Sequence, residues 1–292
     1  MPVFPSMGCT ARRFFGIVEI VAALVEMGCS DLNEEGCRGY TPLSWSACNG
    51  HGGVVKLFLG PAEIDPDKPG NDSRTPLWRA AGSGHVEVVK LLLGQEDVNP
   101  DRPDWLGMTL LSNPAWEGDE GVVRMLLGRE EVNPDKPDDL GRTPLTYAAR
   151  EEHERVVRIL LWRDEVNPNK PDDSDSAPLS NAVWEGHEGV ARMLLGREEI
   201  NPDKPDDSGR TPLSYAAREG REGLVKILLQ RDDVHPDKPE NHRSTPLSLT
   251  AECGHEYVVK ILFGSKRSIP RIMIMMARHR SHVLRSVGLR EW

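Results

Sequence analysis

The feature that most constrains how this chain can fold is a pattern that recurs every 34 residues, in unbroken register, over most of its length. A Pro-Leu pair preceded by Thr or Ala marks six copies, and Leu110-Leu111 takes the slot of a seventh pair. Self-similarity at such a period indicates a solenoid, in which each unit buries its apolar face against its neighbours. The six pairs are Pro42-Leu43, Pro76-Leu77, Pro144-Leu145, Pro178-Leu179, Pro212-Leu213 and Pro246-Leu247.

The first part of each unit predicts a short helix, as the copy that begins at Thr211 illustrates. Thr211 can cap the helix by accepting a hydrogen bond from a free amide of the first turn. Pro212 fits the first helical position, where its missing N–H is not needed. Leu213 and Ala216 lie on one apolar face, and Gly220 can adopt the positive φ that often ends a helix.

A second helix follows, and an extended segment closes the unit. The apolar residues of the second helix fall on one face, for example Leu224, Val225, Leu228 and Leu229. The closing segment carries two prolines in most copies, as in Asn133-Pro134-Asp135-Lys136-Pro137. Each proline fixes its own φ and pushes the preceding residue into an extended conformation. Each unit is therefore predicted to be a helix, a tight turn, a second helix and a stiff finger.

The motif of the first helix resembles that of a known family. Gly141-Arg142-Thr143-Pro144-Leu145, followed by Ala148-Ala149, is similar to the ankyrin repeat, and the similarity covers roughly residues 16–264. This resemblance implies an all-α, ankyrin-repeat solenoid of helix-turn-helix units with extended finger loops. The near-identity of neighbouring units also resembles fungal-type arrays. A tetratricopeptide array has the same period but two long helices per unit, which the prolines of each finger disfavour.

Some positions depart from the ankyrin pattern. The period is one residue longer than the usual 33 because the finger is longer. Pro114 falls inside the first helix of the third unit, where a proline costs about 3 kcal/mol, so that helix is predicted to be distorted or to start late. Glu152 and Asp175 occupy positions where glycine is usual.

We expect three parts along the chain. Residues 1–34 form a divergent N-terminal cap with one repeat helix, residues 35–264 form a seven-unit ankyrin-repeat array, and residues 265–292 form a basic tail outside the register. The tail is either a capping helix or disordered. A charged pair followed by an apolar run near the N-terminus also resembles a signal peptide, but Glu19 interrupts the run and the stretch lies in the repeat register.

Composition and charge limit the partners. The chain of 292 residues has a formal net charge of −10, and because the tail after Gly264 carries +6, the remainder carries −16. An acidic array repels a phosphate backbone, so we expect no nucleic acid partner. No apolar run is long enough for a transmembrane segment. The five cysteines are odd in number and form no CxxC pair, which indicates a reducing, intracellular compartment, cytoplasmic or nuclear.

The polar residues give no sign of an active site. Catalysis needs several different groups at one place, whereas the histidines recur by register, which indicates a structural role. Stacked helices lie about 8–10 Å apart, too far for neighbouring imidazoles to share a zinc ion. No phosphate loop, GxSxG or HExxH motif occurs. We expect no catalysis, no cofactor and no metal. The recurring histidines are His51, His85, His153, His187 and His255.

A solenoid binds its partners where its repeats differ, because the core positions are occupied by stacking. These repeats differ most at the finger tips and at the end of the first helix. In ankyrin-like proteins such positions usually face the ligand, so the resemblance implies a concave partner-binding strip through units two to six. The predicted residues are Trp105, Leu106, Met108, Trp116, Asp139, Leu140, Arg142, Arg150, Asp173, Trp184, Asp207, Arg210 and Arg218.

The third unit stands out, because its tryptophans fall at predicted surface positions and Trp is enriched in binding hot spots. The other interpretation is that these tryptophans fold over the helix around Pro114 and repair its packing. Paired aspartates at the finger tips predict a mildly acidic strip. We expect four cations to offset much of that charge, namely Lys136, Arg142, Lys204 and Arg210.

Together these patterns predict a monomeric, non-enzymatic scaffold that binds another protein on its finger and first-helix surface. The alternative is a regulatory or sensing ankyrin segment of a larger multidomain signalling protein. A third hypothesis is that the protein is a weak enzyme, but no motif in the sequence supports it.

Overall fold

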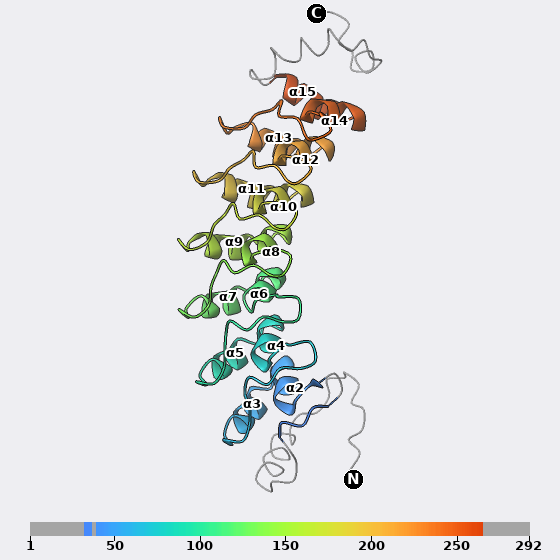
Figure 1. The fold of residues 1–292 in the computed structure, drawn as a ribbon. Coiled ribbons are helices and arrows are strands. Elements are labelled where there is room, and N and C mark those ends of the chain that lie inside the picture. The colour runs from blue at the N-terminus through green and yellow to red at the C-terminus, as the bar shows by residue number, and fades with distance from the viewer. Residues whose placement is uncertain (1–31, 37–38, 265–292) are drawn as a thin grey trace, which may run out of the picture. The chain divides into compact units, whose positions relative to one another are not determined.

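The computed structural model describes residues 32–36 and 39–264, and these residues form helices, turns and irregular segments without a β-strand. Seven pairs of short helices follow one another along the described chain (Figure 1). The predicted all-α architecture of helix-turn-helix units is confirmed. The chain divides into two compact units, residues 1–100 and 101–292, and each is described by itself.

The first unit contains two helix pairs that stack on each other. Helix α2 (Pro42–Cys48) packs on α4 (Pro76–Gly82), and α3 (Gly52–Phe58) packs on α5 (Val86–Leu92). The first helix of each pair also contacts the second. The side chains between the four helices form an apolar core. They include Leu43, Ala47, Val55, Leu77, Ala80, Val89 and Leu92, which are all buried.

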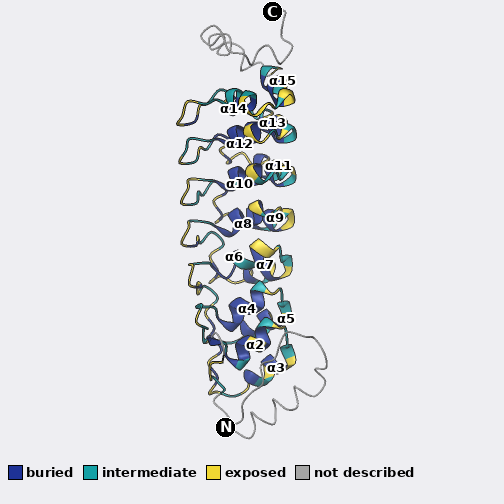
Figure 2. Cartoon of the chain, turned by 90° about the vertical axis from the view of Figure 1, so that its right-hand side faces the viewer, coloured by how far each residue is buried: buried dark blue, intermediate teal, exposed yellow. Residues whose placement is uncertain are grey.

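The second unit contains five helix pairs in two layers. The first helices stack in one layer and the second helices stack beside them, while the finger loops project from the other side of the first-helix layer (Figure 2). The helices are α6 (Ser112–Glu117), α7 (Glu120–Leu126), α8 (Pro144–Arg150), α9 (Glu154–Leu161), α10 (Pro178–Glu185), α11 (Glu188–Leu195), α12 (Pro212–Arg218), α13 (Glu222–Leu228), α14 (Pro246–Cys253) and α15 (Glu256–Gly264).

The core of the second unit lies between the two layers, where the predicted apolar rows are found. Leu224, Val225 and Leu228 of α13 are completely buried, and their register equivalents in α7, α9 and α11 are buried in the same way. Burying one such leucine stabilises the fold by about 1.5–3 kcal/mol. Alanines such as Ala216 allow neighbouring first helices to approach closely.

The first helices begin as the Thr-Pro pair predicts. Thr211 has an extended backbone, and its Oγ1 accepts a hydrogen bond of 3.2 Å from the N–H of Ser214. Pro212 is the first helical residue. In α10 the capping position is Ala177, which offers no side-chain acceptor. The cap that the threonines provide typically contributes about 1 kcal/mol, so α10 depends more on packing than its neighbours do.

Helix α6 starts late, as Pro114 predicts. It begins at Ser112, two register positions after the start of α8 at Pro144. Pro114 is therefore the third residue of α6, within the first turn, where backbone N–H groups have no partner inside the helix. The cost expected for a proline in a helix interior does not arise, because no hydrogen bond of the helix is lost.

The two residues that replace glycine adopt the conformation of glycine. Glu152 has φ 62° and Asp175 has φ 56°, and register equivalents such as Gly220 (φ 67°) and Gly141 (φ 73°) have similar values. A left-handed conformation costs an L-residue roughly 1–2 kcal/mol. The repeat geometry therefore overrides the local preference of these two residues.

Several expectations concern residues outside the described ranges. They are the N-terminal helix and cap, the signal-peptide alternative and the choice between a capping helix and disorder for residues 265–292. The boundaries of the three predicted parts stay predictions. Within residues 32–36 and 39–264, no helix is both long enough and apolar enough to cross a lipid bilayer.

Candidate partner-binding surface

Four finger tips in the second unit are tight hairpin turns, each built around one aspartate, and the fifth tip has Glu240 at this position. Asp138 Oδ1 accepts hydrogen bonds from the backbone N–H groups of Leu140 (2.9 Å) and Arg142 (2.8 Å). The same pair of bonds recurs at Asp104, Asp172 and Asp206. The first aspartate of these four tips is therefore a structural group, and in the three tips with a second aspartate, Asp139, Asp173 or Asp207, the second one is exposed.

The tips are joined from repeat to repeat by backbone hydrogen bonds. The N–H of Asp139 donates to the carbonyl of Leu106 (3.3 Å), and the N–H of Asp173 donates to the carbonyl of Leu140 (3.0 Å). The ladder continues from Asp207 to Ser174 and from Asn241 to Ser208. Neighbouring tips thus form one continuous edge, which holds their side chains in fixed register.

Lysines tie the bases of the fingers together. Lys136 Nζ lies 3.0 Å from the carbonyl oxygen and 2.6 Å from Oδ2 of Asp101, and Lys170 contacts Asp135 in the same way. Burial raises the pKa of Asp135, and the ion pair with Lys170 opposes this shift. The stiff finger is therefore fixed by its prolines and by contacts with the preceding repeat.

The ends of the first helices carry aromatic pairs that lie against the fingers. The ring of Trp116 packs on Tyr147 of the next repeat with centroids 5.0 Å apart, and Trp184 packs on Tyr215 at the same distance. Tyr147 donates its hydroxyl to Asp138 Oδ2 (2.5 Å), and Tyr215 donates to Asp206. Burial and the carboxylate acceptor raise the pKa of Tyr215 to about 12.

We call the finger tips and the C-terminal ends of α6, α8, α10 and α12 the finger/first-helix face. Trp105 (62% exposed), Leu106 and Leu140 project from its tips, and Trp116 and Trp184 expose part of their rings at the helix ends. The remaining predicted residues with an exposed side are Asp139, Arg150, Asp173, Asp207 and Arg218. The interpretation that the tryptophans cover the α6 region is wrong for Trp105, which stays in solvent.

Three predicted residues are less available than the sequence suggests. Met108 is half-buried. Arg142 is half-buried, forms an ion pair of 3.1 Å with the buried Asp138 and lies over the ring of Tyr147. Arg210 pairs with Glu240 at 3.2 Å. Because their guanidinium groups hold the fingers together, these two arginines offer a partner little free charge.

The acidic charge of the tips is partly offset, as the sequence predicts. Of the four cations expected to offset it, Lys136, Arg142 and Arg210 are engaged in the ion pairs described above. Asp207 lies beside Asp175 of the neighbouring tip, and a hydrogen bond between the two carboxyl groups raises the pKa of Asp207. The charge left on this edge is therefore that of the tip aspartates outside these ion pairs, such as Asp139, Asp173 and Asp207.

A family model for ankyrin repeats (3 copies) matches residues 9–104, 52–138, 111–206 and 179–271, which overlap and cover most of the chain. The chain belongs to the ankyrin repeat family. The resemblance drawn from the Thr-Pro-Leu motif is confirmed. No curated protein matches this chain as a relative. Ankyrin repeats are, in general, modules of protein–protein interaction, and the family is typically non-enzymatic.

The histidines of the ankyrin units bind backbone. His153 Nε2 lies 2.7 Å from the carbonyl oxygen of Trp116, and His187 Nε2 lies 2.8 Å from that of Arg150. His255 contacts the carbonyl of Arg218 in the same way. Each ring N–H thus satisfies the end of the preceding first helix, a structural role. No three His, Cys, Asp or Glu residues in the described ranges are grouped to hold a metal ion.

Sequence reasoning missed one residue of this ankyrin array. Trp162, at the C-terminal cap of α9, is the most exposed large apolar side chain in the described ranges, with 81% of its surface in solvent. The repeat register distinguishes this tryptophan, because the same position in other units is a glycine, namely Gly60, Gly94, Gly128 and Gly196.

Proposed function

We propose that this ankyrin array is a non-enzymatic scaffold that binds another protein on the finger/first-helix face of its second unit. One observation carries the proposal: five large apolar side chains are exposed along this one face, on a backbone held in register. Exposed apolar clusters on folded proteins often mark interaction sites. They are Trp105, Leu106, Trp116, Leu140 and Trp184.

The spacing of these residues favours a partner that runs along the repeats. Trp116 and Trp184 are two units apart, which corresponds to about 16–20 Å at the usual distance between packed helices. An extended segment of five or six residues spans roughly that length. The acidic tips beside it favour a partner with positive charge near its apolar anchors, because complementary charge speeds association.

The test compares capture of partners by variants of the intact chain. Trp105→Ala combined with Leu140→Ala removes two exposed anchors, and neither side chain is part of the aromatic pairs that support the fingers. Tyr257→Ser on α15 is the matched control, since it removes an equally exposed aromatic ring from another face. We expect the double variant to lose captured proteins by about tenfold or more, as for hot-spot residues, and the control to retain them.

Circular dichroism and thermal unfolding establish that all variants keep the fold. Partners that are captured equally well by the double variant and by the wild-type chain would remove this face from the proposal. Trp116 and Trp184 are unsuitable for the first test, because their truncation would also take packing from Tyr147 and Tyr215.

The proposal takes the array to be monomeric, without catalytic activity and without affinity for nucleic acid. Ankyrin repeats generally serve protein–protein interaction, which supports the scaffold function. The net charge of −10 supports the exclusion of nucleic acid as a partner. A role as regulatory segment of a larger signalling protein, the fungal-type subgroup and the intracellular compartment stay predictions from the sequence.

A further inference from the structure

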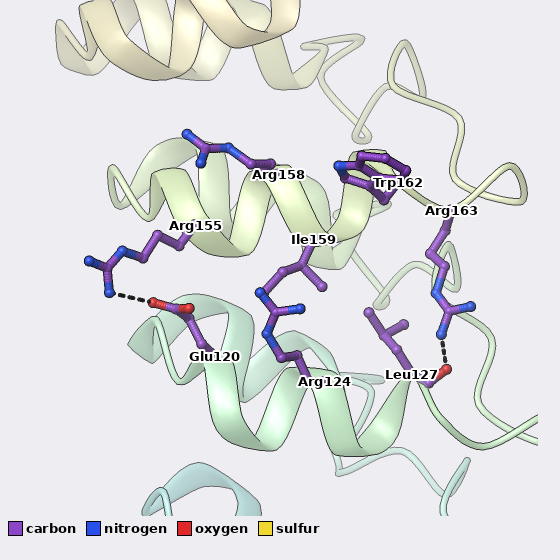
Figure 3. A pocket seen from close by; sticks show the side chains of 8 residues that line it. All are labelled: Glu120, Arg124, Leu127, Arg155, Arg158, Ile159, Trp162 and Arg163. Atoms are coloured by element: carbon purple, nitrogen blue, oxygen red, sulfur yellow. Dashed lines mark hydrogen bonds and ion pairs between the residues drawn. The ribbon is translucent and has the colours of Figure 1, made fainter.

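A groove of about 660 Å³ is lined by residues of α7 and α9 (Figure 3). These two helices belong to the second-helix layer, away from the fingers (Figure 2). The floor of the groove is apolar, with Leu127 and Ile159, and Trp162 stands at one end. Arginines from both helices surround this floor. None of these residues belongs to the finger/first-helix face.

The groove exists because α9 departs from the repeat on one side. Trp162 takes a slot that holds glycine in five of the other units, and Arg155 takes a slot that holds glycine in four. Arg155, Ile159 and Trp162 are four and seven residues apart, so they share one helical face. Since other units stack with glycine at both slots, the stacking does not require these two side chains.

The exposure of Trp162 needs a reason beyond folding. Its indole is 81% exposed, although a glycine satisfies the same position elsewhere in the array. Tryptophan is the residue type most enriched at the energetic centres of protein interfaces. Together with the partly buried Ile159, it offers a partner an apolar contact at the edge of the groove.

Two arginines of the groove have no acidic partner among the residues that the structure describes. In α11 and α13 the equivalent cations pair with a glutamate one turn earlier, as Arg192 does with Glu188 at 3.7 Å. In α7 the corresponding Glu120 is instead bound by Arg155 of α9 at 3.1 Å (Figure 3). Within the described residues, no carboxylate lies within 4 Å of the guanidinium groups of Arg124 and Arg158.

Arg163, the remaining arginine of the groove, has a structural role. Arg163 donates to the carbonyl of Leu127, and Arg197 and Arg231 make the same bond to the preceding repeat. Arg124 and Arg158 are therefore the groove cations without a carboxylate partner among the described residues, and Arg158 makes a weak contact of 3.8 Å with Met193 Sδ on α11. This positive patch differs in sign from the chain as a whole, whose net charge is −10. A negatively charged occupant would complement it.

We propose that this groove binds an acidic peptide segment of a partner protein. Carboxylates of the segment pair with Arg124 and Arg158, and one of its apolar side chains packs on Trp162 and Ile159. A peptide is favoured over a nucleic acid or an anionic membrane, because the acidic remainder of the chain repels extended phosphate surfaces. The array would then hold two proteins on opposite layers.

The test measures binding of synthetic peptides by fluorescence anisotropy with the full chain. The probe is a labelled peptide of Glu and Asp residues around a central Leu, and its control replaces every acid by the corresponding amide. Trp162→Gly, which restores the residue of most other units, should weaken binding of the acidic peptide by about tenfold or more. Arg124→Glu should weaken it comparably and reduce its salt dependence.

Tyr257→Ser on α15, outside both the groove and the finger/first-helix face, is the matched control and should leave the affinity unchanged. Equal binding of the acidic and amide peptides, unchanged binding by Trp162→Gly or absence of binding to the wild-type chain would each overturn the proposal. Vesicles containing phosphatidylserine are tested in parallel. Their binding, lost in Arg124→Glu while the peptide is not bound, would assign the groove to a membrane surface instead.

Discussion

At the scale of single residues, the fingers depend on a few buried polar contacts. Tyr215 donates its hydroxyl to Asp206, whose other oxygen caps the finger turn. Because burial and this acceptor raise the pKa of Tyr215 to about 12, the phenol stays protonated in the folded protein at pH values where a free tyrosine ionises. The link between helix and finger is therefore sensitive to alkaline conditions.

The pH dependence of stability tests this contact. Between the ordinary tyrosine pKa of 10.0 and the folded value of about 12, the folded state binds more protons than the unfolded state. The free energy of unfolding therefore falls as the pH rises through this window. Tyr215→Phe should cost about 1 kcal/mol at neutral pH and should flatten this decline, as measured by urea unfolding at several pH values. An unchanged slope would contradict the assigned contact.

At the scale of elements, the finger is fixed as much by its neighbour as by its own prolines. Lys170 bridges to Asp135 of the preceding finger. Lys204 occupies the next equivalent position, but the residue that faces it in register is Asn169 in place of an aspartate. Within the described residues, no side-chain hydrogen bond or ion pair is found for Lys204. The chain thus contains two lysines at equivalent positions, Lys170 with an ion pair to the preceding finger and Lys204 without one among the described residues.

This natural pair allows a matched comparison. Lys170→Met leaves the half-buried Asp135 without its cation and should destabilise the protein by about 1–2 kcal/mol. Lys204→Met removes a lysine of similar exposure and should change the stability by less than about 0.5 kcal/mol. Chemical denaturation of both variants provides the measurement. Equal losses would show that the ladder of ion pairs does not stabilise the fingers.

At the scale of the whole molecule, the contacts within each compact unit run between neighbouring repeats. Stability in such arrays is approximately a sum of repeat terms and interface terms. His153 connects the α8–α9 repeat to the α6–α7 repeat before it. His187 connects the α10–α11 repeat to the α8–α9 repeat. These bonds belong to different interfaces, so their contributions should be independent.

Additivity can be measured with two single variants and their combination. His153→Ala and His187→Ala each remove a hydrogen bond to a helix end, which should cost about 0.5–1.5 kcal/mol. The double variant should lose the sum within about 0.5 kcal/mol. Denaturant unfolding, fitted with a nearest-neighbour description of the repeats, gives the values. A double loss far from the sum would indicate that the interfaces are coupled.

The sequence by itself determined the family, the helix pairs and their boundaries. The reason is that the Thr-Pro-Leu caps, the apolar rows and the prolines are local signals that recur in most of the seven units, so each copy reinforces the others. It also indicated the late start of α6, because the effect of Pro114 depends on its position within one helix.

Only the tertiary structure decided which polar side chains remain available to a partner. Arg142 and Arg210 looked free along the sequence, yet the carboxylates that hold them come from the folded finger and, for Arg210, from Glu240 in the next repeat. The groove at Trp162 likewise needs α7 and α9 side by side. The contact of Arg210 and the groove join residues about one repeat apart, and the contact of Arg142 with Asp138 depends on the folded turn of its own finger, so no local sequence pattern encodes their geometry.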